Sequence, residues 1–101
     1  MNKVIRELPE LYRSDVQRAV DILKSAGCNQ VFLFGSTAAG GLRTGSDIDL
    51  AIRGCPPGIF YRLLGNLLLE LDHPVDLVDL DSQDPFVQHL KLKGALVEIS
   101  G

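Results

Sequence analysis

The stretch Val31–Ile52, VFLFGSTAAGGLRTGSDIDLAI, joins two short apolar runs through a glycine-rich segment. The first run, Val31–Phe34, is β-branched and aromatic and is ended by a glycine, which predicts a short buried strand. The second run, Asp47–Ile52, alternates along its length, which predicts a strand with one buried face. Because the connection 35–46 is short for a parallel crossover through a helix, we expect the two strands to pair antiparallel.

Two aspartates share the polar face of the second strand. Asp47 and Asp49 are separated by one residue, so their Cα atoms lie about 6–7 Å apart at a rise of ~3.3 Å per residue. Carboxylates at this separation can lean together and share a divalent cation, which a single surface carboxylate binds poorly. The pair is therefore a candidate metal site.

The glycine-rich segment supplies groups that can bind phosphate. Gly35 lacks a Cβ, so its backbone can approach a ligand closely, and Ser36 offers both a hydroxyl and a backbone N–H. We expect a short helical turn over 36–41, and the N-terminus of such a turn favours anions. Hydrogen-bond donors that can bind phosphate, next to paired carboxylates that can bind a metal ion, indicate a site for a metal-bound polyphosphate. Such a site is typical of nucleotidyl transfer.

Two segments, Gly35-Ser36 and Asp47-Ile48-Asp49, have the spacing of the G-S-x(10)-D-x-D signature. On this basis the chain resembles the polymerase-beta-like nucleotidyltransferases. That family needs a third carboxylate on a later strand, and Val75-Asp76-Leu77-Val78 matches it. Within the superfamily the chain is most similar to the minimal nucleotidyltransferases (MNT), small prokaryotic proteins often encoded beside a HEPN-domain partner. The resemblance extends from about residue 31 to residue 78.

The resemblance implies a metal-dependent transfer of AMP from ATP to a hydroxyl group, with pyrophosphate as the leaving group. The catalytic residues and the ligands of two Mg²⁺ ions, or of Mn²⁺, would be Asp47, Asp49 and Asp76. Asp76 would also help to deprotonate the acceptor hydroxyl. The nucleotide would be bound by Gly35, Ser36, Arg43 and Ser46. For Arg43, a solvated loop charge stays open as the alternative.

The resemblance also implies a partner protein. The expected role is the antitoxin of a HEPN/MNT toxin–antitoxin pair, which inactivates a HEPN-domain toxin by adenylylating one of its tyrosines. Many relatives carry an arginine directly before the glycine that matches Gly40, whereas this chain has Ala39. A non-catalytic, nucleotide-binding antitoxin that acts by direct contact therefore stays open as the alternative function. Antibiotic nucleotidyltransferases add a substrate-binding domain to the same core, for which 101 residues leave no space.

Composition limits the remaining classes. The 101 residues are 46% hydrophobic, which favours a single globular domain over 1–101. A net charge of −3 gives no general attraction to nucleic-acid backbones, so we expect a locally held nucleotide and no direct nucleic-acid partner. Without a membrane-length apolar run or a signal peptide, we expect no membrane contact and a cytoplasmic protein. Cys28 and Cys55 lack metal-ligand spacing, and we expect two free thiols.

Helical periodicity predicts three helices, at Pro9–Ala26, Ile59–Leu71 and Pro85–Lys93. The first helix has a polar face that we expect to be solvated, formed by Arg13, Asp15, Arg18, Asp21 and Lys24. We expect the leucine stripe of the second helix, which includes Leu68, to pack on a sheet rather than to form a dimer seam. Both a homodimer and a hetero-oligomer remain open.

The third strand is predicted at Val75–Leu80, and a last short strand at Ala95–Ser100. Four aspartates crowd this region, and their pattern alone does not select the catalytic one: Asp76, Asp79, Asp81 and Asp84. The interior strand position and the family resemblance select Asp76, while Asp84 is placed to cap the helix that follows.

We expect both histidines, His73 and His89, to be surface or packed residues rather than catalytic ones. The strands and helices together predict an α/β (α+β) fold. In this fold a small mixed β-sheet is covered by helices and forms a polymerase-beta-like nucleotidyltransferase core.

Overall fold

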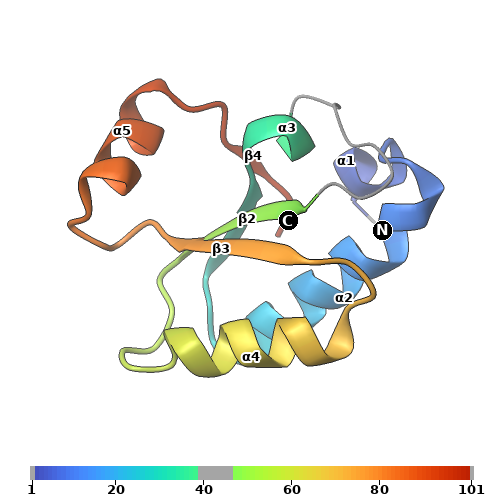
Figure 1. Cartoon of the computed structure of the whole chain (residues 1–101), viewed down its shortest axis with the longest axis horizontal. Helices are drawn as coiled ribbons and strands as arrows, with labels where there is room; N and C mark the ends of the chain where they lie inside the picture. The colour runs from blue at the N-terminus through green and yellow to red at the C-terminus, as the bar shows by residue number, and fades with distance from the viewer. Residues whose placement is uncertain (1, 39–46, 101) are drawn as a thin grey trace.

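The computed structural model describes residues 2–38 and 47–100 (Figure 1). Within this part of the chain, the strands form a mixed sheet with the order β3-β2-β1-β4. The strands are β1 (Gln30–Leu33), β2 (Ile48–Arg53), β3 (Val75–Asp79) and β4 (Val97–Glu98). The helices are α1 (Lys3–Arg6), α2 (Glu10–Ser25), α3 (Gly35–Ala38), α4 (Phe60–Glu70) and α5 (Pro85–Lys93). The predicted fold class, a mixed sheet covered by helices, is confirmed.

Strand directions follow from the connections between strands. The strands β1 and β2 pair antiparallel, as predicted from the short connection between them. The strands β2 and β3 run parallel, and α4 forms the crossover that a parallel pair requires. The last strand, β4, pairs antiparallel with β1 and is shorter than the predicted 95–100. Beyond it, Ile99 N–H still donates to the Val31 carbonyl at 2.8 Å.

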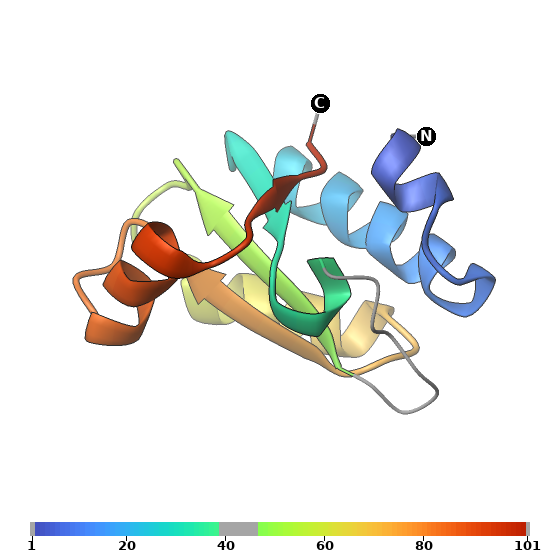
Figure 2. The same ribbon diagram turned by 90° about the horizontal axis from the view of Figure 1, so that it is seen from above.

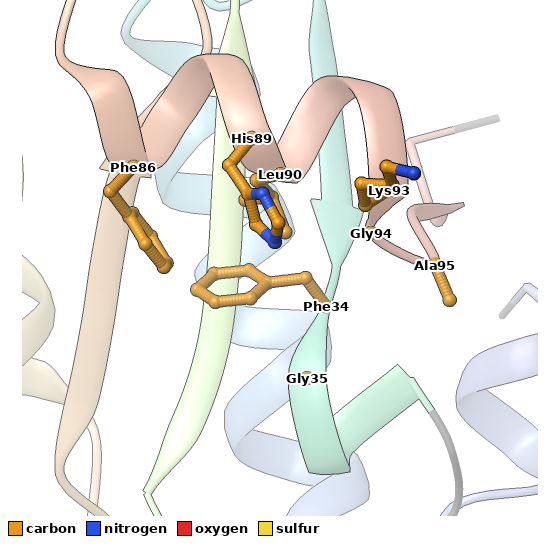
Figure 3. Close-up of a pocket in the computed structure, with 8 residues that line it drawn as sticks. All are labelled: Phe34, Gly35, Phe86, His89, Leu90, Lys93, Gly94 and Ala95. Carbon is orange, nitrogen blue, oxygen red and sulfur yellow. The ribbon is translucent and has the colours of Figure 1, made fainter.

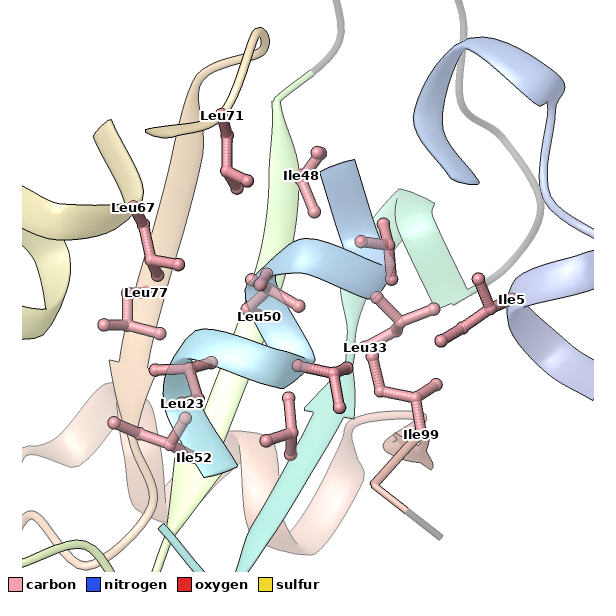
Figure 4. Close-up of a cluster of buried hydrophobic side chains, with 14 of the residues drawn as sticks. Ile5, Leu23, Leu33, Ile48, Leu50, Ile52, Leu67, Leu71, Leu77 and Ile99 are labelled. Atoms are coloured by element: carbon pink, nitrogen blue, oxygen red, sulfur yellow. The ribbon is translucent and has the colours of Figure 1, made fainter. Parts of the chain in front are cut away.

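Helices cover both faces of the sheet (Figures 1 and 2). On one face, α2 and α4 enclose the main core together with α1, and Figure 4 shows the side chains of this cluster. Ile48, Leu50 and Ile52 point into it, as their alternation along β2 predicts. On the opposite face, α5 covers a second cluster, which contains Phe32, Phe34, Ala51, Leu80, Val87 and Leu90.

A glycine follows the C-terminal end of the α2 helix. Gly27 has a φ of 102°, in the left-handed region that favours glycine. Its N–H donates to the Lys24 carbonyl, and Cys28 N–H donates to the Leu23 carbonyl, which together form a Schellman motif. These bonds satisfy two carbonyls at the helix end and direct the chain into β1.

The α2 helix also contains a buried carboxylate, Asp15, which was predicted to lie on the solvated face of this helix. Asp15 is only 1% exposed, so that part of the prediction is wrong. Its oxygens accept hydrogen bonds from Asp72 N–H at 2.9 Å and from His73 N–H at 2.8 Å. Asp15 therefore caps the backbone of the α4–β3 loop from a distant helix, which helical periodicity does not reveal.

The prediction of two free thiols is also wrong. Cys28 and Cys55 form a disulfide, with Cα atoms 3.9 Å apart. The antiparallel register explains why they meet. Gln30 pairs with Arg53, and Cys28 lies two residues before Gln30 while Cys55 lies two residues after Arg53, so the two cysteines lie opposite each other. The bond joins the α2–β1 connection to the segment after β2.

Two other helices, α1 and α4, depart from the sequence prediction in smaller ways. The α1 helix is a single turn, too short to produce a periodic pattern, and the Asn2 side chain caps it by accepting from Val4 N–H at 2.7 Å. In α4, Leu63 and Leu67 are buried as expected, but Leu68 is 53% exposed. Among the residues that the structure describes, none of the helices has the length and apolarity to cross a membrane.

Candidate active site

Two strands bring carboxylates together at one position of the sheet. Asp49 on β2 pairs directly with Asp76 on the parallel strand β3, and Asp47 immediately precedes β2. Ala51 and Val78, each two residues further along its strand, belong to or pack against the cluster under α5. Because side chains alternate along a strand, Asp49 and Asp76 share this face of the sheet. The predicted pairing of D-x-D with a third carboxylate is therefore present in the geometry.

The three carboxylates repel one another. The pKa of Asp49 is raised above its ordinary value, first by partial burial and then by the negative charges of Asp76 and Asp47. Hydrogen bonds from Thr37 oppose this rise without cancelling it. The site therefore concentrates negative charge that a bound cation would stabilise.

The chemistry of these side chains fits a hard divalent cation. Mg²⁺ prefers oxygen ligands, keeps several waters and is usually bound by a few carboxylates together with substrate phosphates. Within residues 2–38 and 47–100, no three acidic, histidine or cysteine side chains are already gathered into a metal-binding group. Asp47, Asp49 and Asp76 are suited to a cation that arrives with a phosphate ligand rather than to a closed protein cage.

Thr37, on α3, orients Asp49 and was not singled out in the sequence. Its side chain is buried, and its Oγ1 accepts a hydrogen bond from Asp49 N–H at 3.0 Å. Its hydroxyl and backbone amide in turn hydrogen-bond to the Asp49 carboxylate. The sequence signal that could have found Thr37 is its position directly after Gly35-Ser36, in the connection between the two predicted strands.

Gly35 is required by the site itself. Its φ is +59°, and a Cβ at this position would lie 2.7 Å from Oδ2 of Asp49. The sequence predicted that this backbone approaches a ligand, and the structure places it against the carboxylate that would hold one. Ser36 follows in α3, while Ala39, Arg43 and Ser46 lie outside the described residues.

The other aspartates near β3 have structural partners. Asp79 pairs with Ile52 at the far end of the strand, and its Oδ1 accepts from Asp81 N–H at 2.9 Å. Asp81 in turn accepts from Gly54 N–H at 2.9 Å. Asp84 caps α5 by accepting from Phe86 N–H, as predicted. Of the four aspartates in this region, Asp76 is the one whose strand register places it opposite Asp49.

The two histidines lie in different surroundings. His73 Nδ1 is 2.7 Å from Oδ2 of Asp15, and its ring lies against Tyr12 at 4.3 Å between centroids. His89 lies on α5 and lines a cavity beside Gly35. His73 is therefore a packed residue at the α2–loop contact, as the sequence reading expected, whereas His89 adjoins the candidate site.

The fold and the carboxylate arrangement are those of a nucleotidyltransferase domain. The family model described as "Polymerase beta, Nucleotidyltransferase" matches residues 17–98, which cover most of the chain. The chain therefore belongs to the polymerase beta nucleotidyltransferase family. A search of the curated proteins finds no significant match.

The solved structures that resemble this chain include toxin–antitoxin complexes. One is the crystal structure of a toxin–antitoxin with AMP-PNP, at 28% identity and a TM-score of 0.62, covering 79% of this chain and 69% of that chain. A mutant of the toxin–antitoxin MntA-HpeT is 25% identical, with a TM-score of 0.57 and coverage of 81% and 69%. A third is a tri-AMPylated Shewanella oneidensis HEPN toxin in complex with MNT antitoxin, at 24% identity, a TM-score of 0.58 and coverage of 83% and 69%. At that identity the last likeness concerns the fold alone. The resemblance to MNT proteins read from the sequence is confirmed.

Proposed function

We propose that this chain is a single MNT domain that transfers AMP from ATP to a hydroxyl group of a HEPN-domain toxin and so acts as its antitoxin. The observation that carries the proposal is the register of β2 and β3, which sets Asp49 opposite Asp76 beside Gly35. The similar toxin–antitoxin complex with AMP-PNP favours an adenine nucleotide and a toxin as partner.

The carboxylates divide the work of the reaction. Asp47 and Asp49 would hold Mg²⁺ against the phosphates of ATP, and Asp76 would complete a second metal position. Bound there, the metal ions stabilise charge on the attacking and leaving oxygens. Thr37 holds the Asp49 carboxylate in place, and Gly35 leaves the space that this carboxylate occupies.

The proposed step is a displacement at the α-phosphorus of ATP. A bond forms between the acceptor oxygen and the α-phosphorus while the bond to the β-phosphate oxygen breaks, and pyrophosphate leaves. Asp76 assists removal of the proton from the acceptor hydroxyl, because a carboxylate can act as a general base when it lies beside the attacking group.

A partner protein would supply the acceptor. From the family resemblance, the acceptor is a tyrosine of the toxin. Attached AMP adds bulk and negative charge, which would hinder a toxin that binds RNA through electrostatic attraction.

The second candidate is an antitoxin that binds nucleotide but acts by contact alone. One observation favours it: Ala39 stands where many relatives have arginine. In this case nucleotide binding would stabilise the protein or its complex without a chemical step.

The proposal is tested by measuring the intact mass of the HEPN-domain protein expected from the neighbouring gene, since MNT proteins are often encoded beside such a partner. The partner is incubated with this protein, ATP and Mg²⁺, and the expected result is the addition of one or more AMP units. Asp47→Asn should abolish the addition, whereas the matched variant Asp79→Asn should retain it, because Asp79 lies at the far end of β3. Inhibition of the toxin without any mass change, equally strong with Asp47→Asn, would favour the contact-only antitoxin.

A further inference from the structure

A cavity of about 330 Å³ lies between α5 and the end of β1 (Figure 3). Residues that line it include Phe34, Gly35, Phe86, His89, Leu90 and Lys93. The α5 residues among them recur at the spacing of one helix face, so a single side of α5 forms the roof. In Figure 3, Phe86 and His89 extend from α5 toward Phe34.

The cavity adjoins the carboxylate site through one shared residue. Gly35 lines the cavity, and a Cβ at Gly35 would lie 2.7 Å from Oδ2 of Asp49. Both features also lie on the face of the sheet that α5 covers. A nucleotide with its phosphates over the carboxylates therefore has this cavity as its immediate neighbour.

The lining suits a planar, anionic molecule. Phe34 and Leu90 are buried and make the inner lining apolar, whereas Phe86 is 53% exposed and His89 and Lys93 are exposed at the rim. Small-molecule sites are concave, mostly apolar and carry a few polar groups, and 330 Å³ is at the lower end of their range. Aromatic side chains stack on nucleobases of any identity, and a lysine attracts phosphate.

Resting on the proposed function, we propose that this cavity binds the nucleoside part of the donor nucleotide. The base stacks against Phe86 and His89, beside the apolar inner lining of Phe34 and Leu90. Lys93 contributes positive charge beside a site that is otherwise acidic. The occupant is the nucleotide rather than an aromatic side chain of a partner protein, because Lys93 at the rim attracts the phosphates that a nucleotide carries and a phenol lacks.

Two ligands separate base binding from phosphate binding. Calorimetric titration with ATP and with inorganic tripolyphosphate, each with Mg²⁺, is compared for the wild type, Phe86→Ala and His89→Ala. We expect about tenfold weaker ATP binding in each variant and a larger loss in the double variant, since stacking on one aromatic side chain contributes about 1–3 kcal/mol, or about 5- to 150-fold in affinity. Tripolyphosphate has no base, so its affinity should not change.

Matched controls lie on the same helix. Leu92→Ala and Lys91→Ala remove exposed side chains of α5 that are absent from the cavity lining, and both should bind ATP as the wild type does. All four positions are exposed, so these variants should fold, which circular dichroism verifies.

Each failure has a distinct meaning. ATP affinity that is unchanged in the double variant overturns the cavity assignment and leaves the carboxylate site intact. Equal weakening of ATP and tripolyphosphate also overturns it, because the side chains would then act on phosphate or on the fold. Loss of partner binding in the double variant, with normal ATP binding, would assign the cavity to the partner instead. A wild type that binds neither ligand overturns the proposed function, and the cavity assignment with it.

Discussion

Asp15 and Asp49 are carboxylates in one small domain core, yet their surroundings have opposite effects on them. Burial raises the pKa of Asp15, but hydrogen bonds from Asp72 N–H and from the His73 ring and backbone outweigh it, so the pKa is lowered overall. For Asp49, burial and the charges of Asp76 and Asp47 together raise the pKa, and Thr37 only partly opposes them.

The difference separates a structural charge, at Asp15, from the charge of a candidate site, at Asp49. The α4–β3 loop supplies hydrogen-bond donors to Asp15. Its carboxylate accepts from the backbone of Asp72 and His73 and contacts the His73 ring, so its charge is stabilised within the protein. The fold gives Asp49 two carboxylate neighbours instead, and it leaves their repulsion in place. Perturbed carboxylates of this kind cluster at sites where a bound ligand, such as a cation, reduces the repulsion. The carboxylate cluster, rather than the Asp15–His73 pair, is therefore the candidate active site.

The largest expected effect is a loss of stability when the Asp15 side chain is removed. Asp15→Ala leaves the amides of Asp72 and His73 without their acceptor, and we expect a loss of about 2–4 kcal/mol in the free energy of unfolding. Asp21→Ala, on the exposed face of the same helix, should change it by less than about 0.5 kcal/mol. Denaturant unfolding measures both. Equal effects for the two variants would mean that Asp15 is not the anchor described.

The stability from Asp15 should also depend on pH. Because its pKa is lowered in the folded protein, its contribution is present above the ordinary value of 3.8 and is lost as the pH falls through the folded pKa. The difference in unfolding free energy between the wild type and Asp15→Asn should therefore be present at pH 7 and shrink below about pH 4. A difference that grows on acidification would reverse the assignment.

The next effect concerns the glycine beside Asp49. Gly35→Ala forces a left-handed backbone on alanine and presses a Cβ against Oδ2 of Asp49, so we expect a loss of about 1–3 kcal/mol together with loss of nucleotide binding. Gly65 is the matched control, since it lies inside α4 with open space where an alanine methyl group would point. Gly65→Ala should stabilise the protein by about 0.5–1 kcal/mol. Thermal unfolding and calorimetric titration with ATP distinguish the two.

The smallest expected effect on stability is at the carboxylate cluster. Asp76→Asn removes a like charge opposite Asp49, so the free energy of unfolding should be unchanged or rise by up to about 1 kcal/mol, while AMP transfer is lost. Asp79→Asn should keep AMP transfer. An active Asp76→Asn with an inactive Asp79→Asn would place the opposite face of β3 in the site.

Local patterns were enough to predict most of the architecture and the carboxylates. Alternation along Asp47–Ile52 separated the core face from the acidic face, and the short connection before it predicted antiparallel pairing. The interior position of Asp76, together with the family spacing, selected the aspartate that β3 sets opposite Asp49.

Contacts between distant segments were not predictable in this way. Asp15 looks like any polar residue of an amphipathic helix, because its partners are 57 and 58 residues away along the chain. The Cys28–Cys55 bond depends on the register of β1 and β2, which spacing alone does not give. The role of Thr37 depends on how α3 turns back onto β2.

We claim that Asp47 and Asp49 hold a metal-bound nucleotide, so ATP with Mg²⁺ should stabilise the folded protein, which thermal unfolding measures. A ligand at one hundred times its Kd stabilises the native state by about 2.7 kcal/mol, so the wild-type Tm should rise by several degrees. The double variant Asp47→Asn, Asp49→Asn should remain folded, with a Tm that ATP and Mg²⁺ do not change. A shift as large in the double variant as in the wild type would contradict the claim.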